Sequence, residues 1–362
     1  MFDPSTFSAA DVFTVDQGIR TPYVQNYNLN IEQQLGSNMA LQVGYVGSAG
    51  RKLFRYRDIN QCVNTVIYGM FTPGTCFPDS APELGSPFGA AGFEYINNFE
   101  SSASSSYNAL QASLKIKTWH GFTSVVNYTW SHSIDNASDG QDFVAQATQP
   151  DNSYRPDRER ANSNFDTRHR FSWNWTYEFP KSETLPWLLS GWQMDGVTTL
   201  MSGQPYNLTY EFEGDFNGSG EFFGRPDMIG NPYAGTNGFL LLNLDAFAVP
   251  CTCAPGTQHF GNVGRNQFVG PTFKNFDWSI VKNTRLGERV NMQIRADVFN
   301  LLNHPNFTNP SLPNFAVDMF TGTTVAGHLF LTPTATPDVG IGNPFLGGGG
   351  PRNIQLAVKF TF

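Results

Sequence analysis

One stretch of this 362-residue chain has the spacing of metal ligands. Asp215, Asn217 and Ser219 alternate and are followed by Gly220, as at the start of a calcium-binding loop. The bidentate Glu that completes such a loop at its twelfth position is replaced by Pro226. The alternatives are an incomplete calcium site and a solvated glycine-rich loop. We favour the loop and assign no metal.

The four cysteines, Cys62, Cys76, Cys251 and Cys253, lie in segments rich in proline and glycine. Cys62 and Cys76 could form a loop disulfide in an oxidising compartment, or they could remain free thiols. Cys251 and Cys253 lack the second pair that a zinc site requires. The disulfide state of Cys62 and Cys76 therefore stays open.

No other pattern indicates catalysis or a cofactor. The six histidines have no metal-ligand spacing, and the glycine run at 347–350 lacks the Lys and Ser/Thr of a phosphate-binding loop. Motifs of serine hydrolases and zinc proteases are absent. A formal net charge of -8 argues against a nucleic-acid partner. The sequence therefore predicts neither an enzyme nor a cofactor-binding protein.

The clearest structural signal is the alternation of the last nine residues. Ile354, Leu356, Val358, Phe360 and Phe362 share one parity, and the residues between them are polar or small. Successive side chains of a strand point to opposite faces, so this strand has one apolar and one polar face. Both a soluble sheet and a membrane-spanning β-barrel produce this pattern, so the rest of the sequence must distinguish between them.

Eight further alternating segments precede this one and form four pairs. In three pairs a short break divides the two members, at 36–37, 120–121 and 286–287. In the remaining pair a turn of about eight residues precedes Trp192. Long connections separate the pairs, at about 49–104, 136–164, 204–270 and 304–351. Long connections are uncommon in compact soluble domains, whereas short turns opposite long loops are typical of outer-membrane β-barrels. The expected fold is all-β: about nine long antiparallel strands with short periplasmic turns and long extracellular loops.

Charge and composition agree with a barrel wall. Aromatic residues make up 14% of the chain, as in the aromatic bands of such barrels. The charged residues of the expected strands fall on the polar parity, except Lys274 and Lys282. These two flank the strand around Trp278, where their long stems can reach the membrane interfaces. No apolar run approaches the roughly 20 residues of a transmembrane helix.

Strand direction gives a further expectation. If Phe362 ends in the periplasm, the first of nine strands also runs inward, and residues 1–20 begin outside the cell. Complete bacterial barrels of one chain have an even number of strands, and residues 1–5 do not resemble a secretory signal peptide. The sequence therefore indicates that residues 1–362 are the C-terminal part of a larger barrel, with residues 1–20 the remnant of an extracellular loop.

An ordered set of short motifs resembles the C-terminal region of TonB-dependent outer-membrane receptors of the Oar-like group. The motifs extend from about residue 20 to the terminus: Thr21–Leu29, Val43–Ser48, Tyr107–Gln111, Asn127–Ser131, Phe165–Phe171, Gly191–Gln193, Ser202–Tyr206, Arg225–Asp227, Phe299–Phe307 and the terminal strand. Each motif is weak alone, and their order makes the set specific. The family's plug domain and TonB box have no counterpart in this sequence.

The resemblance implies a protein of the cell outer membrane that takes up an unidentified extracellular solute. Its partners would be outer-membrane lipid, TonB acting through the missing N-terminal part, and the barrel-assembly machinery. That machinery would read Phe360 and Phe362 as an assembly signal. Two alternatives remain: a structural or adhesive outer-membrane protein, and a soluble β-sandwich carbohydrate-binding module whose apolar parity would form a core.

Overall fold

A computed structural model describes residues 10–61, 93–138, 150–211, 223–236, 241–248, 250, 260–287, 289–307, 309, 314–316 and 350–362. Its largest element is an 11-stranded sheet in which nine long strands form one antiparallel path, each strand paired with the next along the chain. This path confirms the nine expected strands, which are β2 (Tyr23–Leu35), β3 (Met39–Asp58), β4 (Phe93–Trp119), β5 (Phe122–Asp135), β7 (His169–Glu178), β8 (Trp192–Met201), β15 (Phe273–Arg285), β16 (Asn291–Phe299) and β18 (Asn353–Thr361).

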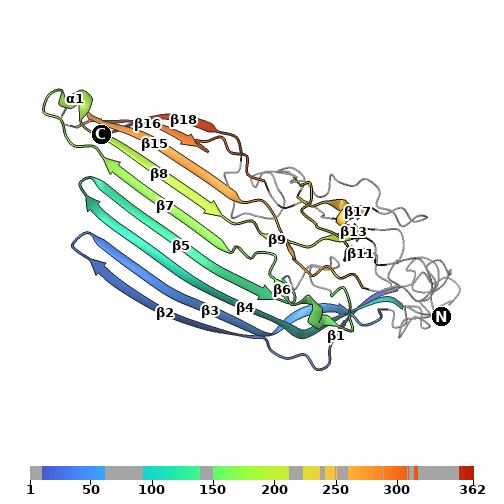
Figure 1. Cartoon of the computed structure of the whole chain (residues 1–362). Coiled ribbons are helices and arrows are strands. Elements are labelled where there is room, and N and C mark those ends of the chain that lie inside the picture. Colours follow the sequence, from blue (N-terminus) through green and yellow to red (C-terminus); the bar gives the residue numbers. More distant parts are fainter. Residues whose placement is uncertain are drawn as a thin grey trace, which may run out of the picture.

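The nine strands form a wall with a turn end and a loop end (Figure 1). The short turns and the C-terminus lie at the turn end. The small strands of the long connections lie beyond the loop end. β2 and β18 are the two edges of the wall, and they are not paired with each other.

Strand register places polar and apolar residues on opposite faces of the wall. Directly paired residues share a face, so one row can be followed across seven strands. One such row is wholly polar: Glu32, Gln42, Ser113, Asn127, Ser172, Thr199 and Asn275. The adjacent row lies on the other face and is apolar until its last member: Ile31, Val43, Ala112, Tyr128, Phe171, Leu200 and Lys274.

Among the described residues, no packed core lies beneath the apolar face. Leu356 on β18 is 77% exposed and Leu29 on β2 is 66% exposed. The buried hydrophobic cluster of the described residues lies instead in the long connections, around Leu208, Leu242 and Phe268. A soluble β-sandwich would cover this face with a second sheet, and the described residues contain none that does so.

Aromatic side chains lie toward both ends of the apolar face, and Trp173, Trp175 and Trp278 lie between them. Register places Phe122, Tyr177, Trp192 and Phe360 near the turn end. Tyr27, Tyr45, Trp130, Phe171 and Phe276 lie toward the loop end. The aromatic residues near the two ends occupy the positions expected where a strand crosses two membrane–water interfaces.

One aromatic ring on this face packs directly over a glycine of the neighbouring strand. The indole of Trp175 lies over Gly196 on the neighbouring strand, where an added Cβ would come within 2.4 Å of the ring. The missing side chain therefore lets a large ring lie flat against the sheet.

The first long connection is shorter than the sequence indicated. β3 continues to Asp58 and β4 begins at Phe93, so residues 59–92 separate the two strands instead of 49–104. Register shifts between Gly50 and Arg55, and Lys52 has a positive φ of 55°. Each bulge inserts an extra residue, so the side chains that follow it point to the opposite face from the one that alternation predicts. A search for strict alternation therefore misses the strand beyond this point.

The turn between β7 and β8 is also longer than expected. It spans residues 179–191 and contains a single helical turn, α1 (Pro186–Leu189). The other short turns follow the sequence prediction: β2 and β3 are separated by 36–38, β4 and β5 by 120–121, and β15 and β16 by 286–290.

The long connections contain small elements of their own. Near the loop end, β1 (Ala10–Val15) adds to β4 in parallel, and β6 (Ala161–Asn162) adds to β5. Two 3-10 turns are also present, η3 (Pro156–Glu159) and η4 (Leu244–Ala246). Three small sheets complete these connections: β9 (Pro205–Tyr206) with β14 (Phe268–Val269), β12 (Asp227–Met228) with β13 (Phe247–Ala248), and β10 (Thr209–Glu211) with β11 (Phe223–Gly224) and β17 (Asn314–Ala316).

Helices are a minor part of this architecture. Among the described residues, none is both long and apolar enough to pass through a membrane.

Val125 and Val126 provide a matched test of the two faces. Val126 pairs with Leu114 and Trp173 on the apolar face, whereas Val125 pairs with Lys115 and Asn174 on the polar face. If the apolar face meets lipid, Val126→Glu should lower the free energy of unfolding by about 1–3 kcal/mol, since Lys or Arg at such a depth costs about 2–4 kcal/mol and Glu somewhat less. The measurement is the urea midpoint of each variant in membranes of the native host.

Val125→Glu is the control, because its carboxylate would lie beside Lys115. It should stay within about 0.5 kcal/mol of the unmodified protein. Equal losses for the two variants would contradict the assignment of the faces.

Candidate functional site on the polar face and the loop-end rim

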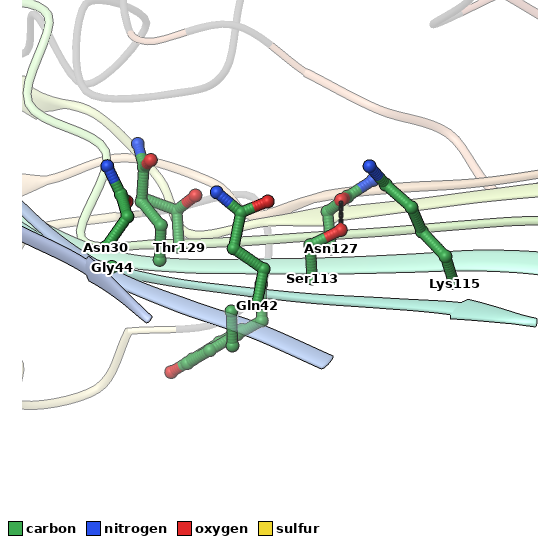
Figure 2. A pocket seen from close by; sticks show the side chains of 10 residues that line it. Asn30, Gln42, Gly44, Ser113, Lys115, Asn127 and Thr129 are labelled. Atoms are coloured by element: carbon green, nitrogen blue, oxygen red, sulfur yellow. Dashed lines mark hydrogen bonds between the residues drawn. The ribbon is translucent and has the colours of Figure 1, made fainter. Parts of the chain in front are cut away.

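The polar face contains a hollow of about 390 Å³ over β2 to β5. Its side chains are mostly amides and hydroxyls, and the polar side chains labelled in Figure 2 rise from the same side of the sheet. The polar members are Asn30, Gln42, Gln111, Ser113, Lys115, Asn127 and Thr129. These groups both donate and accept hydrogen bonds, and Lys115 is the one charged side chain among them.

Cross-strand contacts fix parts of this lining. The Ser113 hydroxyl donates to Asn127 Oδ1 at 2.8 Å (Figure 2). Asn30 lies over Gly44, where a Cβ would come within 2.0 Å of the Asn30 carboxamide oxygen. Such a surface suits polar groups of a solute or of another polypeptide, because it supplies hydrogen bonds without an apolar contact area.

A second site is built from charged residues buried just past the loop end. We define the rim cluster as Asp135, Asp151, Glu159, Arg225 and Arg265. These residues come from β5, from the segment 150–160 that includes η3, and from the third long connection. All five are nearly inaccessible to solvent.

Arg225 is the centre of the rim cluster. Its guanidinium is 1% exposed and donates to both Glu159 carboxylate oxygens, at 2.8 and 2.7 Å. It also lies 3.2 Å from Asp151 Oδ2, and its Nε donates to the Val263 carbonyl at 3.0 Å. Paired, hydrogen-bonded geometry of this kind is what allows charges to be buried.

Arg265 links the same segment to the wall. Its Nε donates to the Glu159 carbonyl at 2.9 Å, and its terminal nitrogen pairs with the Asp135 carboxylate at the loop end of β5. Asp135 is therefore part of a structural ion pair. Within the described ranges, no three His, Cys, Asp or Glu side chains gather as metal ligands.

The end of β3 and the residues just after it also contact the segment 150–160. Gln61 accepts from the Ser153 amide at 2.6 Å and donates to the Asp151 carbonyl at 3.0 Å. Arg57 makes a bidentate pair with Glu100 across the hairpin. Segments far apart in the sequence are therefore joined through polar contacts.

The surroundings shift the pKa values of two of the rim carboxyls, Asp151 and Glu159, in opposite directions. Burial raises the pKa of Asp151 above its usual value, and the nearby charge of Arg225 offsets this only in part. Burial also acts to raise the pKa of Glu159, but hydrogen bonds and charge from Arg225, with charge from Arg265 and Arg55, lower it overall. Of these two carboxyls, Glu159 is therefore the one whose ionised form the cluster stabilises.

The motifs of the sequence resemblance mostly lie at this rim as structural contacts. Asn306 is fully buried and bonds both the amide and the carbonyl of Lys274. Asn300 bonds the His304 backbone and the Gly350 carbonyl, and Asp166 accepts from the Ser133 amide. His169 begins β7 and its ring stacks on Tyr128.

Several sequence-predicted sites lie outside the described residues: the four cysteines, the loop beginning at Asp215, and 347–349 of the glycine run. The two terminal aromatics are described. Phe360 lies on the apolar face of β18, and Phe362 is 93% exposed at the turn end. The rim cluster was not predicted from sequence, because only Arg225 belongs to a recognised motif.

Comparison with known proteins agrees with this architecture. A family model described as an outer membrane beta barrel domain matches residues 2–339. The chain belongs to this family. Its location is therefore the cell outer membrane, and its apolar face is the lipid-facing side of a β-barrel. The turn end is then periplasmic and the loop end extracellular, as the turn and loop lengths indicate.

Solved structures with a similar fold include the outer membrane transporter YddB from Escherichia coli, with a TM-score of 0.48 and 10% identity over 98% of this chain and 34% of that chain. The ferric-catecholate import receptor Fiu from E. coli K12 has a TM-score of 0.39 and 10% identity, over 96% of this chain and 28% of that chain. The FrpB iron transporter from Neisseria meningitidis has a TM-score of 0.35 and 11% identity, over 81% and 29%. The chain thus spans about a third of their length. No curated protein matches it.

Two carboxamide substitutions test the rim cluster. Glu159→Gln should destabilise the described extracellular segments by about 3–5 kcal/mol, because it leaves the buried Arg225 without its bidentate partner. Asp151→Asn should cost less, since burial already favours the neutral form of that carboxyl. Hydrogen–deuterium exchange of residues 150–163 in native membranes measures both effects. Equal protection loss in the two variants would contradict the assigned roles.

A pH series separates the same two groups. The pKa of Glu159 is lowered in the folded state, so its contribution is present above the unfolded value, near 4.3, and is lost as the pH falls through the lowered pKa. Asp151 has the opposite sign, because its raised pKa favours the folded state after protonation. Loss of the Glu159 contribution should therefore raise exchange, corrected for intrinsic rates, as the pH falls below the unfolded value of about 4.3. Glu159→Gln should remove this acid step.

Proposed function

We propose that this chain forms part of the barrel wall and the extracellular loops of a TonB-dependent receptor of the Oar-like group. The ordered sequence motifs support the family subgroup. The amphipathic wall supports a membrane-spanning role, and the polar face provides a hydrophilic path for a solute. In this proposal the extracellular loops capture a solute, and TonB acts on the plug domain of the receptor.

Strand direction is the main observation in favour of a larger barrel. β2 and β18 run in the same direction, because nine strands alternate along the path. Direct closure would pair these edges in parallel, whereas every neighbouring pair of the path is antiparallel. An odd number of additional strands restores antiparallel pairing at both edges. The receptors that the sequence resembles have barrels of 22 strands. Without the nine strands of this path thirteen remain, which is an odd number.

The test uses the assembly as it occurs in the host outer membrane. An epitope inserted at the exposed turn around Gly235 would allow purification in detergent, and it leaves the C-terminus untouched. The purified assembly should bind the periplasmic domain of TonB saturably, as measured by biolayer interferometry. An outer-membrane assembly that exposes the epitope at the cell surface without binding TonB would refute the receptor and favour a structural or adhesive protein.

We also propose that Phe360 and Phe362 form the signal read by the barrel-assembly machinery. β18 supports this role because it is an edge strand, and its terminal aromatic is almost fully exposed. Phe362→Ala should reduce the surface-exposed epitope several-fold, without changing the amount of protein synthesised. Phe299→Ala is the control, because it removes an exposed aromatic from the neighbouring β16. Equal surface levels for the two variants would exclude a dedicated signal.

A further inference from the structure

The periplasmic turn between β7 and β8 differs in chemistry from the other turns. Residues 179–191 include α1 and expose Leu185, Trp187, Leu188 and Leu189, with 43% to 66% of each side chain accessible. The turn between β2 and β3 is instead Gly36-Ser37-Asn38. A cluster of large apolar residues at the surface generally marks a contact with another phase or molecule.

Hydrogen bonds hold this turn in a defined shape. The Ser190 hydroxyl accepts from the Ser182 amide at 2.8 Å and donates to the Ser182 carbonyl at 3.2 Å. The amides of Leu188 and Leu189 both donate to the Leu185 carbonyl. Gly191 then reverses the chain with φ of 80°, where a Cβ would come within 2.3 Å of the Asn283 carbonyl oxygen. The apolar side chains are therefore presented on an ordered scaffold.

Two contacts attach the turn to the lipid-facing side of the wall. The Trp192 indole N–H donates to the Leu188 carbonyl at 2.8 Å, and the Lys282 ammonium donates to the Ser190 carbonyl. Trp192 and Lys282 are paired across β8 and β15 on the apolar face, with the ammonium 5.7 Å from the ring centroid. Figure 1 shows α1 at the turn end, near the C-terminus. The exposed apolar cluster is thus continuous with the lipid-facing surface.

We propose that this turn inserts Trp187 and its leucine neighbours into the phospholipid headgroup–acyl boundary of the periplasmic leaflet. Tryptophan favours that depth because its ring is apolar and its N–H can hydrogen bond, and leucines favour the acyl side. Lys181 and Glu183 precede the helical turn and remain exposed to water. The turn acts as an interfacial anchor that fixes the height of β7 and β8 in the membrane. This proposal rests on outer-membrane placement and not on TonB coupling.

Site-specific photocrosslinking in living cells tests the anchor. Trp187 is replaced by p-benzoylphenylalanine, which keeps a large aromatic side chain at an exposed position. After irradiation, mass spectrometry of the purified protein should show phospholipid adducts at position 187. The same replacement at the exposed Ser37, in the polar turn between β2 and β3, is the matched control. It should give at least tenfold fewer adducts.

The other outcomes overturn the anchor. A discrete protein adduct at position 187 would identify a periplasmic protein partner instead. Equal lipid labelling at 187 and 37, or no labelling at 187, would show that this turn has no special contact with lipid. If the photoreactive variant does not assemble, brominated phospholipids provide the second measurement. They should quench the fluorescence of the unmodified protein more than that of Trp187→Phe, and equal fractional quenching would refute the proposal.

Discussion

The absence of water from the hydrocarbon core of a bilayer is the constraint on which this architecture depends. Each backbone N–H and C=O inside the membrane must be paired within the protein, since an unpaired group costs several kcal/mol. The wall meets this requirement by uninterrupted pairing, for example from Tyr23 with Arg51 to Leu35 with Met39. Once the ladder is continuous, alternation follows, and one face can be wholly apolar while the other stays hydrophilic.

The same constraint explains why packing is distributed differently from a soluble protein. The lipid itself covers the apolar face, so the wall needs no internal core. Beyond the bilayer, water competes for every polar group and order must come from burial. The long connections supply a hydrophobic cluster around Leu208 and Phe268, and they bury Arg225 against Glu159. The ion pair contributes geometry more than net stability, because desolvation offsets much of its attraction.

Sequence patterns predicted the wall well and the rim poorly, for a physical reason. Alternation is a local property, so nine strands and three of their turns could be located from residues two apart. Bulges near Lys52 reverse the parity, which hid the outer part of β3. The length of the turn at 179–191 was underestimated, and its helical turn α1 was not predicted. The rim cluster joins Asp135 to Arg265 across 130 positions, and no local spacing encodes such a contact.

The direction of the edges also limits what can complete the wall. A second copy of this sheet, inserted in the same orientation, would present two inward-running edges, as the first copy does. Pairing β18 of one copy with β2 of another, or β2 with β2, would therefore create a parallel junction. Such a junction departs from the antiparallel pairing throughout the nine-strand path and forms slightly weaker hydrogen bonds. Antiparallel pairing at both edges would require outward-running strands beside β2 and β18, and the edges of a second copy do not supply them.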